Sequence, residues 1–466
     1  MGKTQDICWM SAAKLAKKIR KKKLSPVEVV EAILARIEQI NPKINAYVTL
    51  TTESAISQAK QAEDAVITGE KLGPLHGVPV SIKDLIFTKG VRTTMGSTLC
   101  ENFVPEEDAV LVTRLKQAGA IVLGKTNTPE FGLKPVTFND VFGITRNPWN
   151  LEKAPGGSSG GAAAAVASGL GPIAVGNDGT GSIRNPSSCC GLFGIKPQFG
   201  RIPRYPVFHG AELVTHEGPI TRTVEDAAVM LDVMSGPHWG DVFSIPKPEK
   251  SFTKYIDKGV KGLRIAWSPD LGFAKATPEV IAICEQAAKA FAQMGATVEE
   301  AHPHFENPEG LPGMIWGSDY LEAFSMFGSI ETILDKLHPI TQAMVLVATE
   351  LKATDYARTI FRKQELAASF GEFFQSYDLL VTPTLPEPPP PADYADPIGY
   401  LTVVSFLITS NFTGQPAASI PAGWTSDGLP VGLQIIGRPY DEATIFQAAA
   451  AFEEAHPWRE RIPPLD

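Results

Sequence analysis

Two glycine-rich segments near the middle of the chain constrain its fold most strongly. Residues 156–161 read GGSSGG, and residues 178–184 read DGTGSIR. Glycine lets a backbone turn sharply and approach a ligand closely, so each segment predicts a tight turn that presents a serine. The alanine-rich run at 162–168 predicts a helix between them, and the apolar residues 173–175 predict a strand. A flexible linker would not lie between a strand and a helix, so both turns belong to an ordered core.

The rest of the pattern alternates between strands and helices. Residues 25–28 read SPVE, a capping box with proline at the first helical position, and predict a helix that ends near Asn41-Pro42. Alternation of this kind predicts an α/β fold in which helices cover a sheet. Further strands are expected at 75–82, with Lys83 at the end, and at 120–123, 263–267 and 379–382, and further helices at 108–118 and 278–293.

Length and charge limit the class of protein. The chain has 466 residues, enough for one large α/β domain or two average ones, and a net charge of −9. Nucleic acid is not expected as the main partner, because binding to phosphates needs a basic surface. One basic run lies at 14–23. We interpret it as the solvated face of a short helix packed through Leu15 and Ile19, with a membrane or RNA contact as the alternative.

Targeting and metal signals are missing from the sequence. Five scattered cysteines are too few for a disulfide framework, and Cys189 and Cys190 are expected to be buried. Residues 1–10 lack the apolar run of a signal peptide, and the longest apolar stretch is broken by Pro172. The pair His302-x-His304 has no accompanying zinc motif. We therefore expect a cytoplasmic protein with no membrane partner, no metal and no cofactor.

A serine nucleophile needs a base, and Lys83 is the candidate. Histidine is the usual base, but none of the eight histidines pairs with an acid at a spacing that supports this role. Lysine is the other option, since Ser-Lys sites exist. Lys83 ends an apolar strand, where burial would disfavour its charged form.

The two turns, with Ser182 placed 24 positions (182 − 158) after Ser158, resemble the signature of the amidase signature family. The resemblance spans nearly the whole chain and implies a single amidase domain over residues 1–466, with a core signature region at about 75–205. The implied fold is α/β, with a central mixed twisted β-sheet covered by helices on both faces. The aromatic-rich segment 300–375 is either a helical cap over the site or part of the core. Similar segments also lie at 77–84, 124–127, 147–150 and 429–437.

This resemblance implies a Ser-cisSer-Lys triad in which Lys83 is the base, Ser158 the bridging serine and Ser182 the nucleophile. The bond between Gly157 and Ser158 is then expected to be cis, and Ser159 is the competing choice for the bridge. A neutral Lys83 would draw a proton from Ser158, which would draw one from Ser182 as Ser182 attacks the carbonyl and forms an acyl-enzyme. A lysine with a pKa near 10.4 pays about 4.6 kcal/mol to be neutral at pH 7, so burial is part of the expected chemistry.

The second turn is expected to hold the oxyanion that forms in this attack. Asp178 and Arg184 bracket the turn and are expected to fix its shape by hydrogen bonds rather than to take part in the chemistry, with an ordinary surface ion pair as the alternative. Thr180 stands where the family commonly has glycine, and a β-branched residue disfavours positive φ, so this position bears on the choice of substrate. The expected oxyanion donors are the backbone N–H groups of Gly179, Thr180, Gly181 and Ser182.

The implied function is an amidase that hydrolyses the C–N bond of a small carboxamide, whether aryl, linear or cyclic; related enzymes also cleave esters and carbamates. The alternative is the A subunit of a glutamyl-tRNA(Gln)/aspartyl-tRNA(Asn) amidotransferase, which usually carries Met-Asp-Glu-Phe where this chain has TPEF at 128–131. A phosphate cradle at 156–161 is a third interpretation, but the Gly-Lys-Ser/Thr of a P-loop is missing. Substrate choice is expected to lie in Thr128–Phe142, in 300–375 and in Pro383–Tyr400, and a homodimer is compatible with the sequence.

Overall fold

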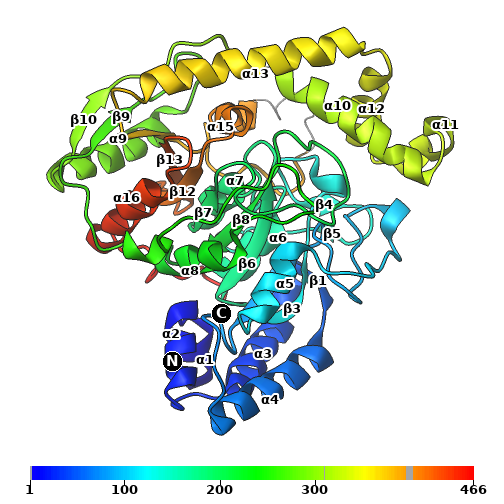
Figure 1. Ribbon diagram of the computed structural model, residues 1–466, viewed down its shortest axis with the longest axis vertical. Helices are drawn as coiled ribbons and strands as arrows, with labels where there is room; N and C mark the ends of the chain where they lie inside the picture. Colours follow the sequence, from blue (N-terminus) through cyan, green and yellow to red (C-terminus); the bar gives the residue numbers. More distant parts are fainter. Residues whose placement is uncertain (1–2, 309, 395–401, 466) are drawn as a thin grey trace.

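A mixed sheet of 11 strands runs through the part of the chain that the structure describes, residues 3–308, 310–394 and 402–465 of the computed structural model (Figure 1). Parallel and antiparallel neighbours both occur, as expected for a mixed α/β sheet. In spatial order the strands are β1 (Tyr47–Leu50), β3 (Ile121–Thr126), β2 (Pro79–Lys83), β6 (Ile173–Asp178), β8 (His216–Thr221), β7 (Phe193–Lys196), β12 (Ala417–Trp424), β13 (Pro430–Gly437), β11 (Leu379–Pro383), β9 (Arg264–Trp267) and β10 (Thr297–Glu300), with β4 (Phe138–Asn139) and β5 (Gly143–Ile144) as a separate hairpin.

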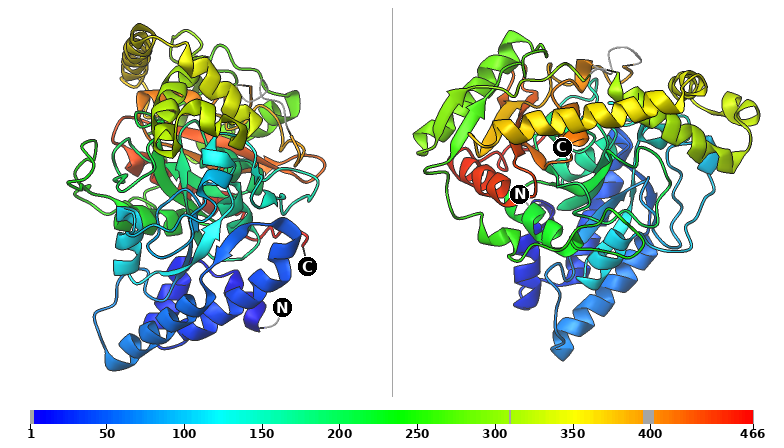
Figure 2. Two further views of the ribbon diagram at one scale, coloured as in Figure 1. Left: turned by 90° about the vertical axis from the view of Figure 1, so that its right-hand side faces the viewer. Right: turned by 45° about the horizontal axis from the view of Figure 1, so that its top comes forward.

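Helices surround this sheet, as the views in Figures 1 and 2 show. They are α1 (Lys3–Cys8), α2 (Ala12–Arg20), α3 (Pro26–Ile44), α4 (Thr52–Thr68), α5 (Val110–Gln117), α6 (Gly160–Ala167), α7 (Arg184–Cys190), α8 (Val224–Met234), α9 (Pro278–Gln293), α10 (Leu311–Phe324), α11 (Ile330–Ile333), α12 (Pro339–Thr349), α13 (Ala353–Phe373), α15 (Ile408–Thr413) and α16 (Glu442–Ala455).

Element interiors follow the sequence predictions, but several ends differ. Helix α3 has the predicted capping box at Ser25, yet it continues past Pro42 to Ile44. A proline in the last turn removes a single intrahelical hydrogen bond, and the burial of Ile40 and Ile44 holds that turn in place. Strand β2 begins at Pro79 rather than at 75, while β6 extends past the predicted residues to Asp178.

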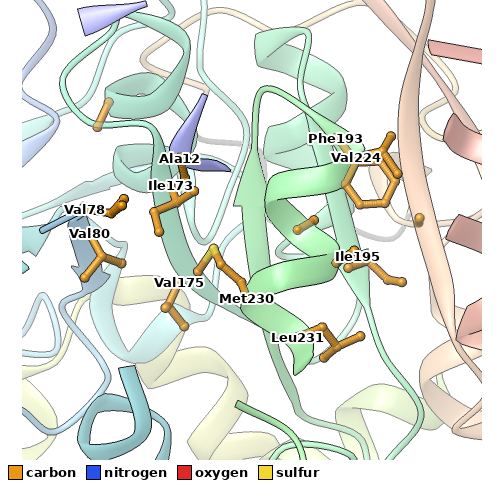
Figure 3. Packing of buried hydrophobic residues seen from close by; sticks show 14 of the residues in the cluster. Ala12, Val78, Val80, Ile173, Val175, Phe193, Ile195, Val224, Met230 and Leu231 are labelled. Atoms are coloured by element: carbon orange, nitrogen blue, oxygen red, sulfur yellow. The ribbon is translucent and has the colours of Figure 1, made fainter. Parts of the chain in front are cut away.

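Apolar side chains fill the space between the sheet and α8. Figure 3 shows Met230 and Leu231 of α8 beside Val175 of β6 and Ile195 of β7. All four side chains are fully buried. Burial on this scale is the main stabilising term for the sheet, at roughly 25 cal/mol for each Å² of apolar surface removed from water.

Two strands bring the two predicted functional regions to one edge of the sheet. β2 and β6 are parallel neighbours, so their C-terminal ends meet at the same edge. Lys83 ends β2, and Asp178 ends β6 immediately before the DGTGSIR turn. The lysine and the turn are therefore adjacent because of the strand register.

Residues 300–375 are mainly helical and lie together as the yellow-green layer of α10 to α13 in Figure 1. Tyr320 and Phe324 of α10 are buried in a second hydrophobic cluster, which also contains Phe131. Phe361 of α13 is 63% exposed, so the aromatic residues of this segment do not share a single environment. The segment is a helical layer whose buried side chains share a hydrophobic cluster with the rest of the protein.

The remaining sequence expectations concern the surface and the thiols. Leu15 and Ile19 of α2 are fully buried, as predicted for the basic run. Cys189 and Cys190 are buried, and all five cysteines are free thiols. Among the residues that the structure describes, no helix has both the length and the apolar composition that crossing a membrane requires.

Candidate active site

Lys83 is fully buried at the end of β2, beside the GGSSGG turn. Its Nζ lies 2.6 Å from Ser158 Oγ and 2.5 Å from Asn177 Oδ1. Burial lowers the pKa of Lys83 to about 7, although the charges of Glu217 and Asp178 act in the opposite direction. A large fraction of Lys83 is therefore neutral near pH 7, where its lone pair can accept a proton.

Asn177 orients this amine. Its Oδ1 can only accept a hydrogen bond, so it fixes one N–H of Lys83 and leaves the lone pair of the neutral amine free to face Ser158. This is the geometry that a base acting on the Ser158 hydroxyl requires.

The GGSSGG turn places Ser158 rather than Ser159 against the lysine. The Gly157–Ser158 peptide bond is cis, and Ser158 is 2% exposed. Ser159 is fully buried and donates its hydroxyl to the carbonyl oxygen of Asn177 at 3.2 Å. Gly157 packs so closely on the chain at Val136 that a Cβ would lie 2.7 Å from the Val136 nitrogen, so this turn requires glycine.

Ser182 lies in the next turn and is half-buried. Its carbonyl oxygen accepts the N–H of Ser159 at 3.2 Å, so the two glycine-rich turns are in direct contact. Within the described residues the Ser182 hydroxyl makes no hydrogen bond, including none to Ser158. The structure therefore contains the Lys83–Ser158 contact of the expected relay, while the Ser158–Ser182 contact stays a prediction.

Asp178 holds the backbone of the second turn. Its carboxylate accepts the N–H of Gly181 at 2.7 Å and that of Ile183 at 3.1 Å. This corrects one sequence expectation, because an N–H that already donates to a carboxylate is not available to an oxyanion. The N–H groups of Gly179 and Ser182 donate to no described residue.

The conformation of this turn also explains how Thr180 is accommodated. The positive φ falls on Gly181, at 120°, and not on Thr180. A Cβ at Gly181 would also collide with the side chain of Leu407. Thr180 is 2% exposed, so its side chain faces the interior rather than the solvent.

Arg184 and Asp178 form a fully buried ion pair with an Nη2–Oδ1 distance of 2.9 Å. Arg184 also donates to Gln434 and Ser410, and Asn411 donates to Asp178. Burial alone would raise the pKa of Asp178. The charge of Arg184, the hydrogen bonds from Arg184 and Asn411 and the charge of Lys196 together outweigh burial and hold that pKa well below its usual range. The alternative of an ordinary surface ion pair is wrong, because the pair fixes the turn from inside the protein.

Two of the three segments expected to select the substrate touch the site. In Thr128–Phe142, Gly132 lies so close to Ser158 that a Cβ would be 3.2 Å from Oγ. In 300–375, Trp316 covers the second turn, since a Cβ at Gly179 would be 3.5 Å from Trp316 Cζ2. The third segment, Pro383–Tyr400, lies outside the described residues from position 395 onward.

Sequence reasoning missed Asn177, Glu217 and Asn411. Asn177 carried a local signal, a polar residue near the end of an otherwise apolar strand. Glu217 and Asn411 carried none, because strand pairing and chain packing bring them in from distant positions.

In the parts of the chain that are described, His, Cys, Asp and Glu side chains form no group of three or more that could hold a metal ion. The rings of His302 and His304 lie 5.7 Å apart.

Known proteins that resemble this chain include amidases and amidotransferase A subunits. The Amidase family model matches residues 28–446. An acylamidase of Rhodococcus erythropolis is 40% identical over 98% of each chain, and the glutamyl-tRNA(Gln) amidotransferase A subunit of Moorella thermoacetica is 37% identical over 99% of each. Among solved structures, a bacterial aryl acylamidase of the amidase signature family has 30% identity and a TM-score of 0.89 over 97% of each chain. A 6-aminohexanoate cyclic dimer hydrolase complexed with substrate has 32% identity and a TM-score of 0.92, over 98% of this chain and 99% of that one.

Proposed function

The chain belongs to the amidase signature family, and from that premise we propose that it hydrolyses the C–N bond of a small carboxamide with Lys83, Ser158 and Ser182. The observation that carries the proposal is the buried Lys83, whose Nζ lies 2.6 Å from Ser158 Oγ and whose pKa is lowered to about 7 by burial. A lysine in this setting is available as a base near neutral pH, because burial favours its neutral form and Ser158 lies within hydrogen-bond distance of the amine.

Acylation begins with two linked proton transfers. Lys83 accepts the proton of Ser158, and Ser158 accepts that of Ser182 as Ser182 Oγ forms a bond with the carbonyl carbon. The negative oxygen of the tetrahedral intermediate is held by N–H groups of Gly179, Thr180 and Ser182. Gly181 is left out of this set because its N–H donates to Asp178.

Collapse of the intermediate breaks the C–N bond. The proton held by Lys83 returns through Ser158 to the leaving nitrogen, which departs as a neutral amine. Water then attacks the ester on Ser182 while the same relay takes its proton, and the carboxylic acid is released. Each oxyanion donor contributes on the order of 10²–10³ in rate.

The substrate class is the finer part of the proposal. The acylamidase and aryl acylamidase relatives support linear and aryl amides, and the cyclic dimer hydrolase supports a cyclic amide. Trp316 and Gly132 are two residues of the surrounding segments that lie against the glycine-rich turns. We propose that these two positions limit the size of the acyl group. We further propose a cytoplasmic enzyme that acts without a nucleic acid, a membrane or a cofactor.

The second candidate function is the amidotransferase A subunit, because several curated relatives at 34–37% identity carry that name. The segment 128–131 departs from the pattern usual for that subunit. Its Glu130 is buried and accepts hydrogen bonds from Ser97 and Thr341, so here it anchors α12 to the body of the protein. Glu130 and Phe131 match the pattern of that subunit, so the departure that favours the free-standing hydrolase lies at Thr128 and Pro129.

The experiment that separates the two functions uses the purified chain alone. Release of amine from a panel of anilides, linear amides, cyclic amides, esters and carbamates is measured without tRNA or added proteins. We expect cleavage of at least one amide class. Activity that appears only with amidotransferase partners and tRNA would establish the second function instead.

A further inference from the structure

Glu217 lies one strand beyond the residue that orients the lysine. Asn177 of β6 and Glu217 of β8 are directly opposite each other in the antiparallel pair, so their side chains occupy the same face of the sheet. Asn177 Oδ1 accepts from Lys83 Nζ at 2.5 Å. The chain thus places a carboxylate next to the amide that touches the base.

The Glu217 carboxylate has fewer hydrogen bonds than a buried carboxylate with a purely structural role would have. Glu217 is 4% exposed, and its Oε1 accepts from Arg204 Nε at 3.5 Å, the limit of a hydrogen bond. Its Oε2 is buried without a hydrogen-bond partner. Buried polar atoms are ordinarily paired, so an unpaired carboxylate oxygen calls for another explanation.

A small cavity of about 40 Å³ lies beside both side chains. Asn177, Arg204, Glu217 and Tyr320 are among the residues that line it. This volume has room for at least one water beside Asn177 and Glu217.

The charges around Lys83 make Glu217 distinct from Asp178. The two carboxylates are the groups whose charges favour the ammonium form of Lys83. The charge of Asp178 is neutralised by Arg184, which lies 2.9 Å away and donates to both carboxylate oxygens, the same oxygens that hold the turn. The charge of Glu217 is neutralised less completely. Its partner Arg204 lies 3.5 Å away and also pairs with Glu212 at 3.0 Å.

We propose that Glu217 is a positioning residue for the hydrolysis: it acts through Asn177 on Lys83, stabilises the ammonium that forms when Lys83 takes the proton, and so sets the pH at which the enzyme becomes active. This inference rests on the proposed function. A buried ammonium is costly without a counter-charge, and a carboxylate nearby lowers that cost during catalysis. Burial keeps Lys83 neutral at rest, and Glu217 keeps it basic enough to work.

The pKa directions agree with this geometry. Burial lowers the pKa of Lys83, and Glu217 is the largest charge that opposes this effect. Burial raises the pKa of Glu217 itself, while Arg204 and Lys83 act to lower it and Glu212 to raise it. The two groups therefore favour each other's charged forms.

The test measures the rate at which an aryl sulfonyl fluoride modifies Ser182 as a function of pH, which requires no knowledge of the natural substrate. In the wild type this rate should rise as Lys83 loses its proton. In Glu217→Gln we expect the midpoint to fall by on the order of 1 pH unit, since the charge lies about two strand spacings of about 4.8 Å away in a medium of effective dielectric constant about 20. The plateau rate should fall several-fold, because a weaker base accelerates less.

The chain offers two matched variants. Glu212→Gln removes a carboxylate from the same Arg204 without facing Lys83, so its midpoint should equal the wild-type value. Glu217→Asp retains the charge and should restore most of the wild-type midpoint. A merely structural role for Glu217 would slow the reaction at every pH and leave the midpoint unchanged.

An unchanged midpoint in folded Glu217→Gln would overturn the inference and leave the proposed function intact. Modification of Ser182 in Lys83→Met at the wild-type rate would instead overturn the proposed function. If Glu217→Gln does not fold, Glu217→Leu removes the same charge without leaving a buried amide. The midpoint should again fall by on the order of 1 pH unit, and no fall would overturn the inference.

Discussion

In the proposed mechanism a single buried lysine is the residue that accepts the proton. Lys83 is fully buried and shares its amine between Ser158 and Asn177. Burial disfavours the charged form of the lysine, which is what a base near neutral pH requires. The serines do not need unusual acidity, because proton transfer along the relay coincides with the attack on the carbonyl.

The first prediction concerns pH. Since burial lowers the pKa of Lys83 to about 7, kcat/KM should be nearly constant above this pH and fall about tenfold for each unit below it. The sign follows from the active form, which is the neutral amine. A pH series with a neutral anilide measures this fall in kcat/KM. A rate that is constant from pH 5 to pH 9 would contradict the role of Lys83 as a base.

The second prediction concerns the loss of the amine. Lys83→Met keeps the apolar stem and removes the base, so kcat should fall by about 10²–10⁴. The thermal midpoint should not fall much, because a buried polar group is replaced by an apolar one of similar length. Steady-state rates and a melting curve on the same sample check both parts. A kcat within tenfold of the wild type would be the opposing result.

At the scale of elements, the second turn is rigid because a buried ion pair holds it. Asp178 accepts N–H groups from its own turn, and Arg184 connects that turn to α15 and β13. The turn therefore has little freedom to adapt during the reaction, as oxyanion stabilisation by preorganised donors requires.

Asp178→Asn should break this element. It leaves Arg184 charged and buried beside a neutral amide, which costs about 3–5 kcal/mol when a buried pair loses one partner. Denaturant unfolding measures the loss of stability, and amine release measures the accompanying loss of activity. Wild-type stability in this variant would show that the pair does not anchor the turn.

Gly181→Ala should impair the same turn for another reason. The φ of 120° disfavours any side chain, and the new Cβ would collide with Leu407. We expect activity to fall more than stability, since the displaced backbone is next to Ser182. Comparison with Gly259→Ala, where a Cβ meets open space, separates the collision from the effect of positive φ alone.

The sequence predicted the interiors of the helices and strands better than their ends and their contacts. Lys83, Ser158 and Ser182 could be named from the sequence because each lies at a strand end or tight turn that resembles the family signature, and the contact of Lys83 with Ser158 agrees with this choice, while the catalytic roles stay predictions. The role of Gly181 was predicted wrongly, because no local pattern reveals that Asp178 takes its N–H. Helix α3 and strand β6 were found from their periodicity, but their ends depend on packing and strand pairing that the sequence does not display.

The whole molecule places the site between the central sheet and the helical layer of α10 to α13. Trp316 of α10 lies over Gly179, so this layer reaches the catalytic turn. The fold of the layer could be predicted as helical, but its contact with the turn could not, because the two are separated by more than 100 positions in the chain. Such a layer is suited to selecting substrates without changing the triad.

Trp316→Ala should therefore change the choice of substrate. With the indole removed, the KM for substrates with bulky acyl groups should fall roughly tenfold relative to the KM for small ones. The rate of acylation by a small amide should stay close to the wild-type rate. Phe361→Ala is the matched control, since Phe361 belongs to the same helical layer and is 63% exposed. Equal effects on small and bulky substrates would argue against a selective role for Trp316.

The central claim is that Ser182 becomes acylated, and the mass of the trapped intermediate tests it most directly. The protein is mixed with an activated anilide, quenched in acid within the first turnover and digested for peptide mapping. The peptide containing Ser182 should gain the mass of the acyl group, and Lys83→Met should show no such gain on this timescale. Acylation on Ser158 or on another residue, or release of amine with no acylated peptide at all, would contradict the claim.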